Sequence, residues 1–176
     1  MKVNVIGIVR DHLSTLRDAR SNRMDYGDVL IFYGVPIASA AAAYFLKFSL
    51  KTDAYNVSIT FFGIFLALLL NIQVAIFSIF QRKWVEPVDK RLAEKQKAVL
   101  EERRSLLGEL NSNISYLTVV SSVALVSIFV FFVAGWTSGA GPAVVLALYS
   151  HFMLTFIMII KRAHALFQKE YRDSPQ

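Results

Sequence analysis

Apolar residues along this chain gather into long runs that contain no charged side chain. Charged residues are absent from 29–46, 54–81 and 110–160. A helix needs about 20 apolar residues to cross a bilayer core, so the first two runs can each provide one span and the third can provide two. Strands are not expected, because a few isolated strands would leave unpaired edges in lipid. The pattern therefore predicts an all-α integral membrane protein with four transmembrane helices.

The four expected spans form two hairpins, one over 29–81 and one over 116–160. The turn of the second hairpin is indicated by two glycines and a proline between Trp136 and Pro142, which favour a turn over a continuing helix. The individual spans are placed at 29–47, 58–81, 117–136 and 143–160.

The distribution of Lys and Arg predicts how the spans are oriented. All but two of the 19 basic residues lie in 1–28, in the loop 82–115 or in the tail 161–176. Because basic residues concentrate in cytoplasmic loops, we expect both termini to be cytoplasmic and the protein to sit in a bacterial inner membrane. A cleaved signal peptide is disfavoured, because the 28 residues before the first run are too many and carry four aspartates.

Two cytoplasmic helices are expected beside the spans. In the N-terminal segment, residues 3–20 can form an amphipathic helix, because apolar residues recur there at three- and four-residue steps. Such a helix either lies on the inner leaflet or docks a partner, and both interpretations stay open. The stripe consists of Ile6, Val9, Leu13 and Leu16.

The loop 82–115 is the main soluble feature. Apolar residues repeat there at seven-residue spacing among Lys, Glu and Arg, which indicates a charged helix with one narrow apolar seam. The seam either packs within the chain or docks sister subunits or a soluble cytoplasmic protein. Its residues are Leu92, Val99, Leu100, Leu106 and Leu107.

A few polar side chains interrupt the apolar runs at membrane depth: Asn71, Gln73, Ser127 and His151. By helix rise, Asn71 and His151 lie at nearly the same depth, about 15 Å from the inner boundary. Unpaired polar groups are costly in lipid, so these side chains should face one another, another subunit or water. One interpretation is a hydrogen bond from His151 to Asn71 or Gln73 that locks two helices together. The other is a polar layer that lines a path through an oligomer.

The first span carries small residues every four positions, at Gly34, Ala38 and Ala42. Small residues let membrane helices approach closely, so this face packs either within the bundle or against another subunit. Pro36 lies on the same span, and a proline there can kink the helix and free a backbone carbonyl.

Composition narrows the chemistry further. The chain is 55% hydrophobic, has no cysteine, and contains neither a glycine-rich phosphate loop nor an HExxH motif. We therefore expect no enzymatic activity, no cofactor and no metal site. The net charge of +6 does not indicate nucleic-acid binding, because acidic residues alternate with the basic ones, as in Glu101-Glu102-Arg103-Arg104.

The whole-chain layout, four spans with both ends inside and a charged helix in the middle loop, resembles small membrane components of bacterial anti-phage defence systems. The membrane subunit of Kiwa-type systems and some four-span immune effectors share this layout. The resemblance implies a homo-oligomer that senses or permeabilises the membrane with a soluble partner. The leading hypothesis is a non-enzymatic oligomer that couples a membrane bundle to a cytoplasmic partner or to sister subunits. An ion channel or pore is the first alternative, and a small-solute transporter is the second.

Overall fold

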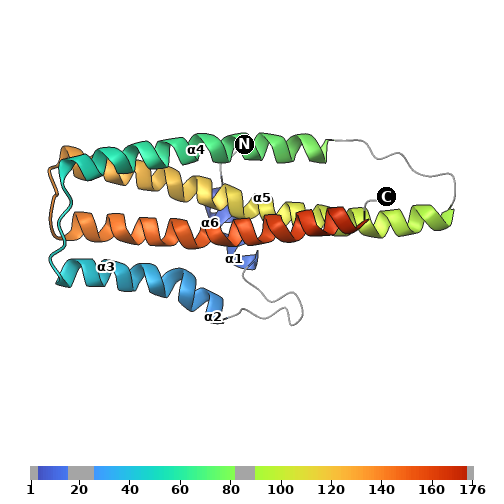
Figure 1. Cartoon of the computed structure of the whole chain (residues 1–176), viewed down its shortest axis with the longest axis horizontal. Coiled ribbons are helices and arrows are strands. Elements are labelled where there is room, and N and C mark those ends of the chain that lie inside the picture. The colour runs from blue at the N-terminus through green and yellow to red at the C-terminus, as the bar shows by residue number, and fades with distance from the viewer. Residues whose placement is uncertain (1–3, 16–25, 82–89, 174–176) are drawn as a thin grey trace.

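The computed structural model describes residues 4–15, 26–81 and 90–173 (Figure 1). Within these ranges the chain folds into helices and contains no strand, which confirms the expected all-α class for this part of the protein. The elements are α1 (Val5–Thr15), α2 (Tyr26–Val29), the π-helix η1 (Leu30–Gly34), α3 (Val35–Phe45), α4 (Thr52–Phe80), α5 (Lys90–Val133) and α6 (Ala140–Asp173).

Three helices contain segments long and apolar enough to cross a membrane, and they are Thr52–Phe80, Val99–Val133 and Ala140–Gln168. Only a minority of their side chains are buried inside the chain, so most of their apolar surface faces outward. Apolar surface on this scale needs a lipid or protein neighbour, which makes the protein membrane-embedded. The apolar helical segment Leu30–Phe45, where the first span is expected, is shorter than the other three.

The charged helix expected in 82–115 and the third expected span are parts of one helix. α5 runs without interruption from Lys90 to Val133 and crosses the boundary at 115–116. Neither proline nor glycine occurs after Gly108 in this helix. Asn113 does not interrupt it either, because its side-chain Nδ2 donates to the Glu109 carbonyl of the same helix at 2.9 Å. The tail is likewise continuous with the last span, because α6 extends to Asp173.

The four long or apolar helical segments lie side by side in the order α4, α5, α6 and α3 (Figure 1). α4 packs along α5, α5 along α6, and α3 along α6. Aromatic rings from α4 and α6 fill the centre of the bundle, with ring centroids about 5 Å apart. These rings are Phe61, Phe62, Phe65, Tyr149, Phe152 and Phe156.

At the charged end, α5 and α6 extend past the membrane-sized part of the bundle. Leu107 and Leu110 of α5 belong to the same buried cluster as Leu166 of α6, so the two extensions pack together. We call 90–110 of α5 and 161–173 of α6 the stalk. α1 lies across α5 near the base of the stalk (Figure 1).

Candidate functional site

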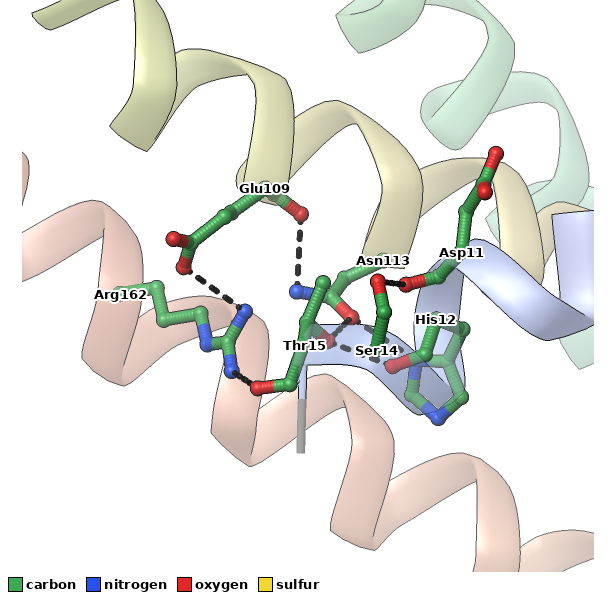
Figure 2. Close-up of polar contacts among 7 residues, drawn as sticks. All are labelled: Asp11, His12, Ser14, Thr15, Glu109, Asn113 and Arg162. Carbon is green, nitrogen blue, oxygen red and sulfur yellow. Dashed lines mark hydrogen bonds and ion pairs between the residues drawn. The ribbon is translucent and has the colours of Figure 1, made fainter. Parts of the chain in front are cut away.

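Three helices bring polar side chains together at the base of the stalk (Figure 2). α1 supplies two of them, α5 supplies two and α6 supplies one. Arg162 lies 22 residues after Ala140, or about 33 Å along α6, which matches the thickness of a hydrocarbon core. The group therefore lies about one hydrocarbon-core thickness from the start of α6. We call it the inner polar cluster, and its members are His12, Thr15, Glu109, Asn113 and Arg162.

Asn113 is the centre of the inner polar cluster. Its side chain is fully buried, with Nδ2 donating to the Glu109 carbonyl. Its Oδ1 lies 2.8 Å from His12 Nδ1 and 2.8 Å from the Thr15 hydroxyl (Figure 2). Because Oδ1 only accepts hydrogen bonds, His12 Nδ1 must carry the proton and donate it. One amide on α5 thus fixes both the position of α1 and the tautomer of its histidine.

His12 is held neutral at this position. Its side chain is fully buried, and its Nε2 has no hydrogen-bond partner in the described part of the chain. Burial lowers the pKa of His12 to about 4, against the opposing effect of the Asn113 hydrogen bond, and the nearby His151 and Arg162 lower it slightly further. A protonated imidazole would place an uncompensated charge between the helices.

Arg162 joins α6 to both other helices. Its guanidinium donates to Glu109 Oε2 on α5 at 3.3 Å and to the Thr15 carbonyl at the end of α1 (Figure 2). A basic side chain at a helix C-terminus satisfies a carbonyl that has no partner within the helix. The ion pair with Glu109 is half-exposed, so it contributes mainly orientation rather than stability.

A second set of contacts continues from the inner polar cluster toward the middle of the bundle. The His12 ring stacks on Tyr116, with centroids 3.8 Å apart and planes inclined by 3°. The Tyr116 hydroxyl lies 2.7 Å from His151 Nε2 on α6. His151 Nδ1 in turn lies 3.0 Å from the Phe32 carbonyl in η1. Because a carbonyl cannot donate, Nδ1 carries the proton, and Nε2 accepts from Tyr116.

The Phe32 carbonyl is available because of the proline that follows it. Pro36 has no N–H to donate to the carbonyl four residues earlier, which is that of Phe32. The helix takes the wider π form over Leu30–Gly34, which ends two residues before Pro36. π-helical turns often occur at functional positions in proteins. Here the free carbonyl gives His151 a fixed partner on the first apolar helix.

Together these contacts form one continuous path, which we call the polar path. It runs from Asn113 through His12, Tyr116 and His151 to the Phe32 carbonyl. The path joins α1, α5, α6 and η1. In the described residues no group of three or more His, Asp or Glu side chains could hold a metal ion.

The fold and this site define the class of the protein: a helical membrane protein with a polar junction at one boundary of its bundle. Comparison with known protein families, with curated proteins and with solved structures finds no match.

The polar residues predicted at membrane depth divide among different contacts. Gln73 Nε2 donates to the Ser115 hydroxyl at 2.8 Å, and His151 bonds to Tyr116, the next residue along α5. Each of them therefore bonds to α5, and the expected hydrogen bond between them is not present. Phe62 pairs with Phe152 and Phe65 with Phe156, so His151 lies level with Phe62, and Asn71 lies about 14 Å nearer the stalk rather than at the expected common depth. Asn71 is exposed on α4, and half-buried Ser127 lies about 17 Å farther along α5 than Tyr116.

The small residues of the first span do not provide its packing face within the chain, and their role at a subunit contact stays a prediction. Gly34 is half-buried, whereas Ala38 and Ala42 are exposed. α3 meets α6 through Ser39 instead, whose hydroxyl accepts from Ser150 at 3.0 Å, and Pro36 and Ala43 are buried near it.

The predicted seam of the charged helix is partly used inside the chain. Leu107 is buried, and Leu106 packs on the same cluster as Leu166 of α6. Leu100 is half-buried, Val99 is 44% exposed, and the Leu92 side chain lies outside the described residues. The half of the seam nearest the membrane therefore belongs to the chain's own buried core.

Sequence reasoning missed His12, Asn113, Tyr116 and Arg162. The stripe predicted for the N-terminal helix is Ile6, Val9, Leu13 and Leu16, of which Leu16 lies outside the described residues. Ile6 is 81% exposed, and the fully buried residue of α1 is His12. One signal was available: Asn113 is a strong hydrogen-bonding residue inside a charge-free run. Its partner could not be inferred, because His12 is 101 residues away in the sequence.

Proposed function

We propose that this protein is a non-enzymatic membrane protein that couples its helical bundle to the cytoplasm through α1 and the stalk. The observation that carries the proposal is the polar path, in which His151 inside the bundle is linked through Tyr116 to His12 on α1. A hydrogen bond between membrane helices is worth about 1 kcal/mol, so a small change in the bundle suffices to alter how firmly α1 is held.

The proposal includes a bacterial inner membrane, four spans and cytoplasmic termini. The fourth span would consist of α2, η1 and α3, which together extend about 30 Å over Tyr26–Phe45. On this topology α1 and the stalk lie on the cytoplasmic side, where Val99 offers an exposed apolar contact to a soluble partner or sister subunit. The anti-phage setting that the layout implies belongs to the same proposal, and plaque counts on a host that expresses the protein test it.

Hydrogen–deuterium exchange of the α1 amides tests the coupling. An 11-residue helix is marginal in isolation, so the α1 amides are protected only while α1 is docked. His151→Phe removes both hydrogen bonds of the imidazole without touching α1. We expect exchange over Val5–Thr15 to rise about five-fold.

Ser150→Ala is the matched control. Ser150 is the neighbour of His151, and its hydroxyl also reaches the first apolar helix, through Ser39, but it is not part of the polar path. Ser150→Ala should leave α1 exchange unchanged. Equal exchange in wild-type protein and His151→Phe would contradict the coupling.

A further inference from the structure

An open hollow lies between α4 and α6 at the end of the bundle opposite the stalk (Figure 1). Its volume is about 420 Å³, which falls within the range of pockets that bind small molecules. Most of its lining is apolar, with Val57 on α4, Leu146 on α6, and Phe48 and Leu50 in the turn between α3 and α4. We call it the α4–α6 hollow.

The walls of the α4–α6 hollow are fixed parts of the fold. The Leu50 N–H donates to the Thr137 carbonyl at 2.9 Å, so the turn before α4 is joined to the turn before α6. On the α6 side, the Tyr149 ring packs against Phe61 and Phe62 of α4, with centroids 5.2 and 4.9 Å apart. The hollow therefore exists without a ligand to shape it.

The α4–α6 hollow reaches about as deep as one leaflet of a bilayer. Tyr149 lies nine residues after the start of α6 at Ala140, or about 13 Å along the helix. Half of a hydrocarbon core is about 15 Å thick. Val57, which lines the hollow, is 67% exposed, so the hollow opens on the surface of a membrane-embedded helix. Apolar cavities exclude water and accept hydrocarbon, and here lipid supplies it.

A second hollow adjoins the first. Its volume is about 360 Å³, and Val57 lines it together with Thr60, Phe61 and Ile64. The two hollows therefore lie beside one shared side chain. This arrangement offers two neighbouring sites for hydrocarbon, which matches the two acyl chains of a phospholipid.

The charged residues at this end of the chain occur beside the α4–α6 hollow. Lys47, Lys51 and Asp53 are the only Lys, Arg, Asp or Glu residues in 29–80 and 111–160. Asp53 lines the hollow, and Lys51 lies in the sequence between Asp53 and Leu50. All three charged side chains are exposed, and none makes a hydrogen bond or an ion pair within the described residues. A carboxylate and an ammonium group are thus both available to a headgroup.

We propose that the two hollows hold a phospholipid with an ethanolamine headgroup, taken from the leaflet opposite the stalk. Its acyl chains lie in the hollows, its phosphate pairs with Lys51 and its ammonium pairs with Asp53. Each pairing brings opposite charges together at the membrane surface. An ethanolamine ammonium has N–H donors that form charge-assisted hydrogen bonds with a carboxylate, whereas a choline headgroup has none. The site should therefore prefer ethanolamine over choline lipids.

Native mass spectrometry of the detergent-solubilised full-length protein tests the site. It is titrated with phosphatidylethanolamine and with phosphatidylcholine of identical acyl chains. We expect one phosphatidylethanolamine per chain, with a dissociation constant about five-fold lower than that for phosphatidylcholine, as one exposed ion pair provides. Equal affinity for the two lipids would overturn the proposal. A dimer that binds no lipid would also overturn it and would assign the hollows to a second copy.

Filling the hollows provides a matched pair of variants. Val57→Trp places a large ring where the two hollows meet and should raise the dissociation constant for phosphatidylethanolamine at least about ten-fold, because acyl surface loses its apolar contacts. Val74→Trp makes the same change at a position of the same helix that is 68% exposed, about 26 Å farther along α4, and should leave the constant unchanged. Equal binding by the two variants would refute the site.

The headgroup contacts are separated by two further substitutions. Asp53→Asn should raise the constant for phosphatidylethanolamine to that for phosphatidylcholine and leave the latter unchanged. Lys51→Gln should weaken both lipids alike, because both carry the phosphate. A preference for phosphatidylethanolamine that persists in Asp53→Asn would overturn the headgroup assignment. None of these results bears on the coupling test, because exchange in α1 is measured at the other end of the bundle (Figure 1).

Discussion

His12 is a neutral imidazole enclosed by three helices, and its burial links the docking of α1 to its protonation state. Asn113 holds its Nδ1–H, Tyr116 covers its ring, and Arg162 lies nearby as a fixed positive charge. Undocking of α1 would return the imidazole to water, where it binds a proton near pH 6.5. Docking of α1 and protonation of His12 therefore oppose each other.

Acidification should release α1. The pKa of His12 is lowered from 6.5 to about 4 in the docked state, so docking is fully stable above pH 6.5 and weakens as pH falls toward 4. The full loss below pH 4 is about 3 kcal/mol. Exchange over Val5–Thr15, corrected for the intrinsic effect of pH, should rise in this window. His12→Gln should abolish the rise, and His164→Gln, at an exposed position on α6, should preserve it. A pH-independent exchange rate in wild-type protein would contradict this account.

At the scale of the helices, α4 and α6 are joined by aromatic packing, whereas α3 is joined to α6 by small and polar contacts. Phe62 and Phe152 are fully buried, with ring centroids 5.4 Å apart in an edge-to-face arrangement. Such ring pairs stabilise the fold beyond the contribution of their buried apolar area. In contrast, Ser39 and Phe32 meet α6 through single hydrogen bonds. The first apolar helix is therefore held by small side chains and single hydrogen bonds rather than by aromatic rings.

Phe62→Ala should destabilise the bundle strongly. Removing a fully buried ring leaves a cavity and should lower the free energy of unfolding by about 3 kcal/mol. Unfolding in mixed detergent micelles measures the change. Phe77→Ala removes the same side chain from the same helix at a position that is 61% exposed, and it should change stability by less than about 1 kcal/mol. Similar effects of the two substitutions would contradict the packing described for α4.

At the scale of the whole molecule, the membrane boundaries decide which surfaces meet water. The inner polar cluster and the end of α4 lie toward the stalk, whereas the turns after α3 and α5 lie at the opposite end (Figure 1). α2, η1 and α3 must cross the membrane if these two turns are on one side and α1 is on the other. The proposed fourth span therefore depends on the arrangement of the whole chain rather than on the length of one helix.

Labelling with an impermeant maleimide checks this topology. Glu101→Cys on the stalk should react only from the cytoplasmic side of the membrane. Ser49→Cys and Ser138→Cys, at exposed positions in the two turns, should react only from the other side. The three positions test the positive-inside orientation together with the number of spans. Reaction of Ser49→Cys from the same side as Glu101→Cys would show that the first apolar helix does not cross the membrane.

Much of the architecture was predictable because lipid imposes a simple rule on sequence. Uncharged runs of sufficient length must be helical, and this gave the three membrane-sized helices and the turn before Ala140. The missing N–H of proline likewise indicated that Pro36 frees a backbone carbonyl. The exact partner of that carbonyl was not predictable, because His151 reaches Phe32 from 119 residues away.

The sequence alone determines the helical class, the membrane environment and the turn before Ala140, because each follows from local hydrophobicity and backbone chemistry, but it does not show that α5 and α6 continue into the stalk. Only the tertiary structure decides which polar side chains meet. Asn71 and Gln73 are two residues apart, yet one points outward and the other bonds to Ser115, since two residues turn a helix by about 200°. Which side of a helix faces its neighbours depends on how all the helices pack together. The same packing places His12 in the inner polar cluster.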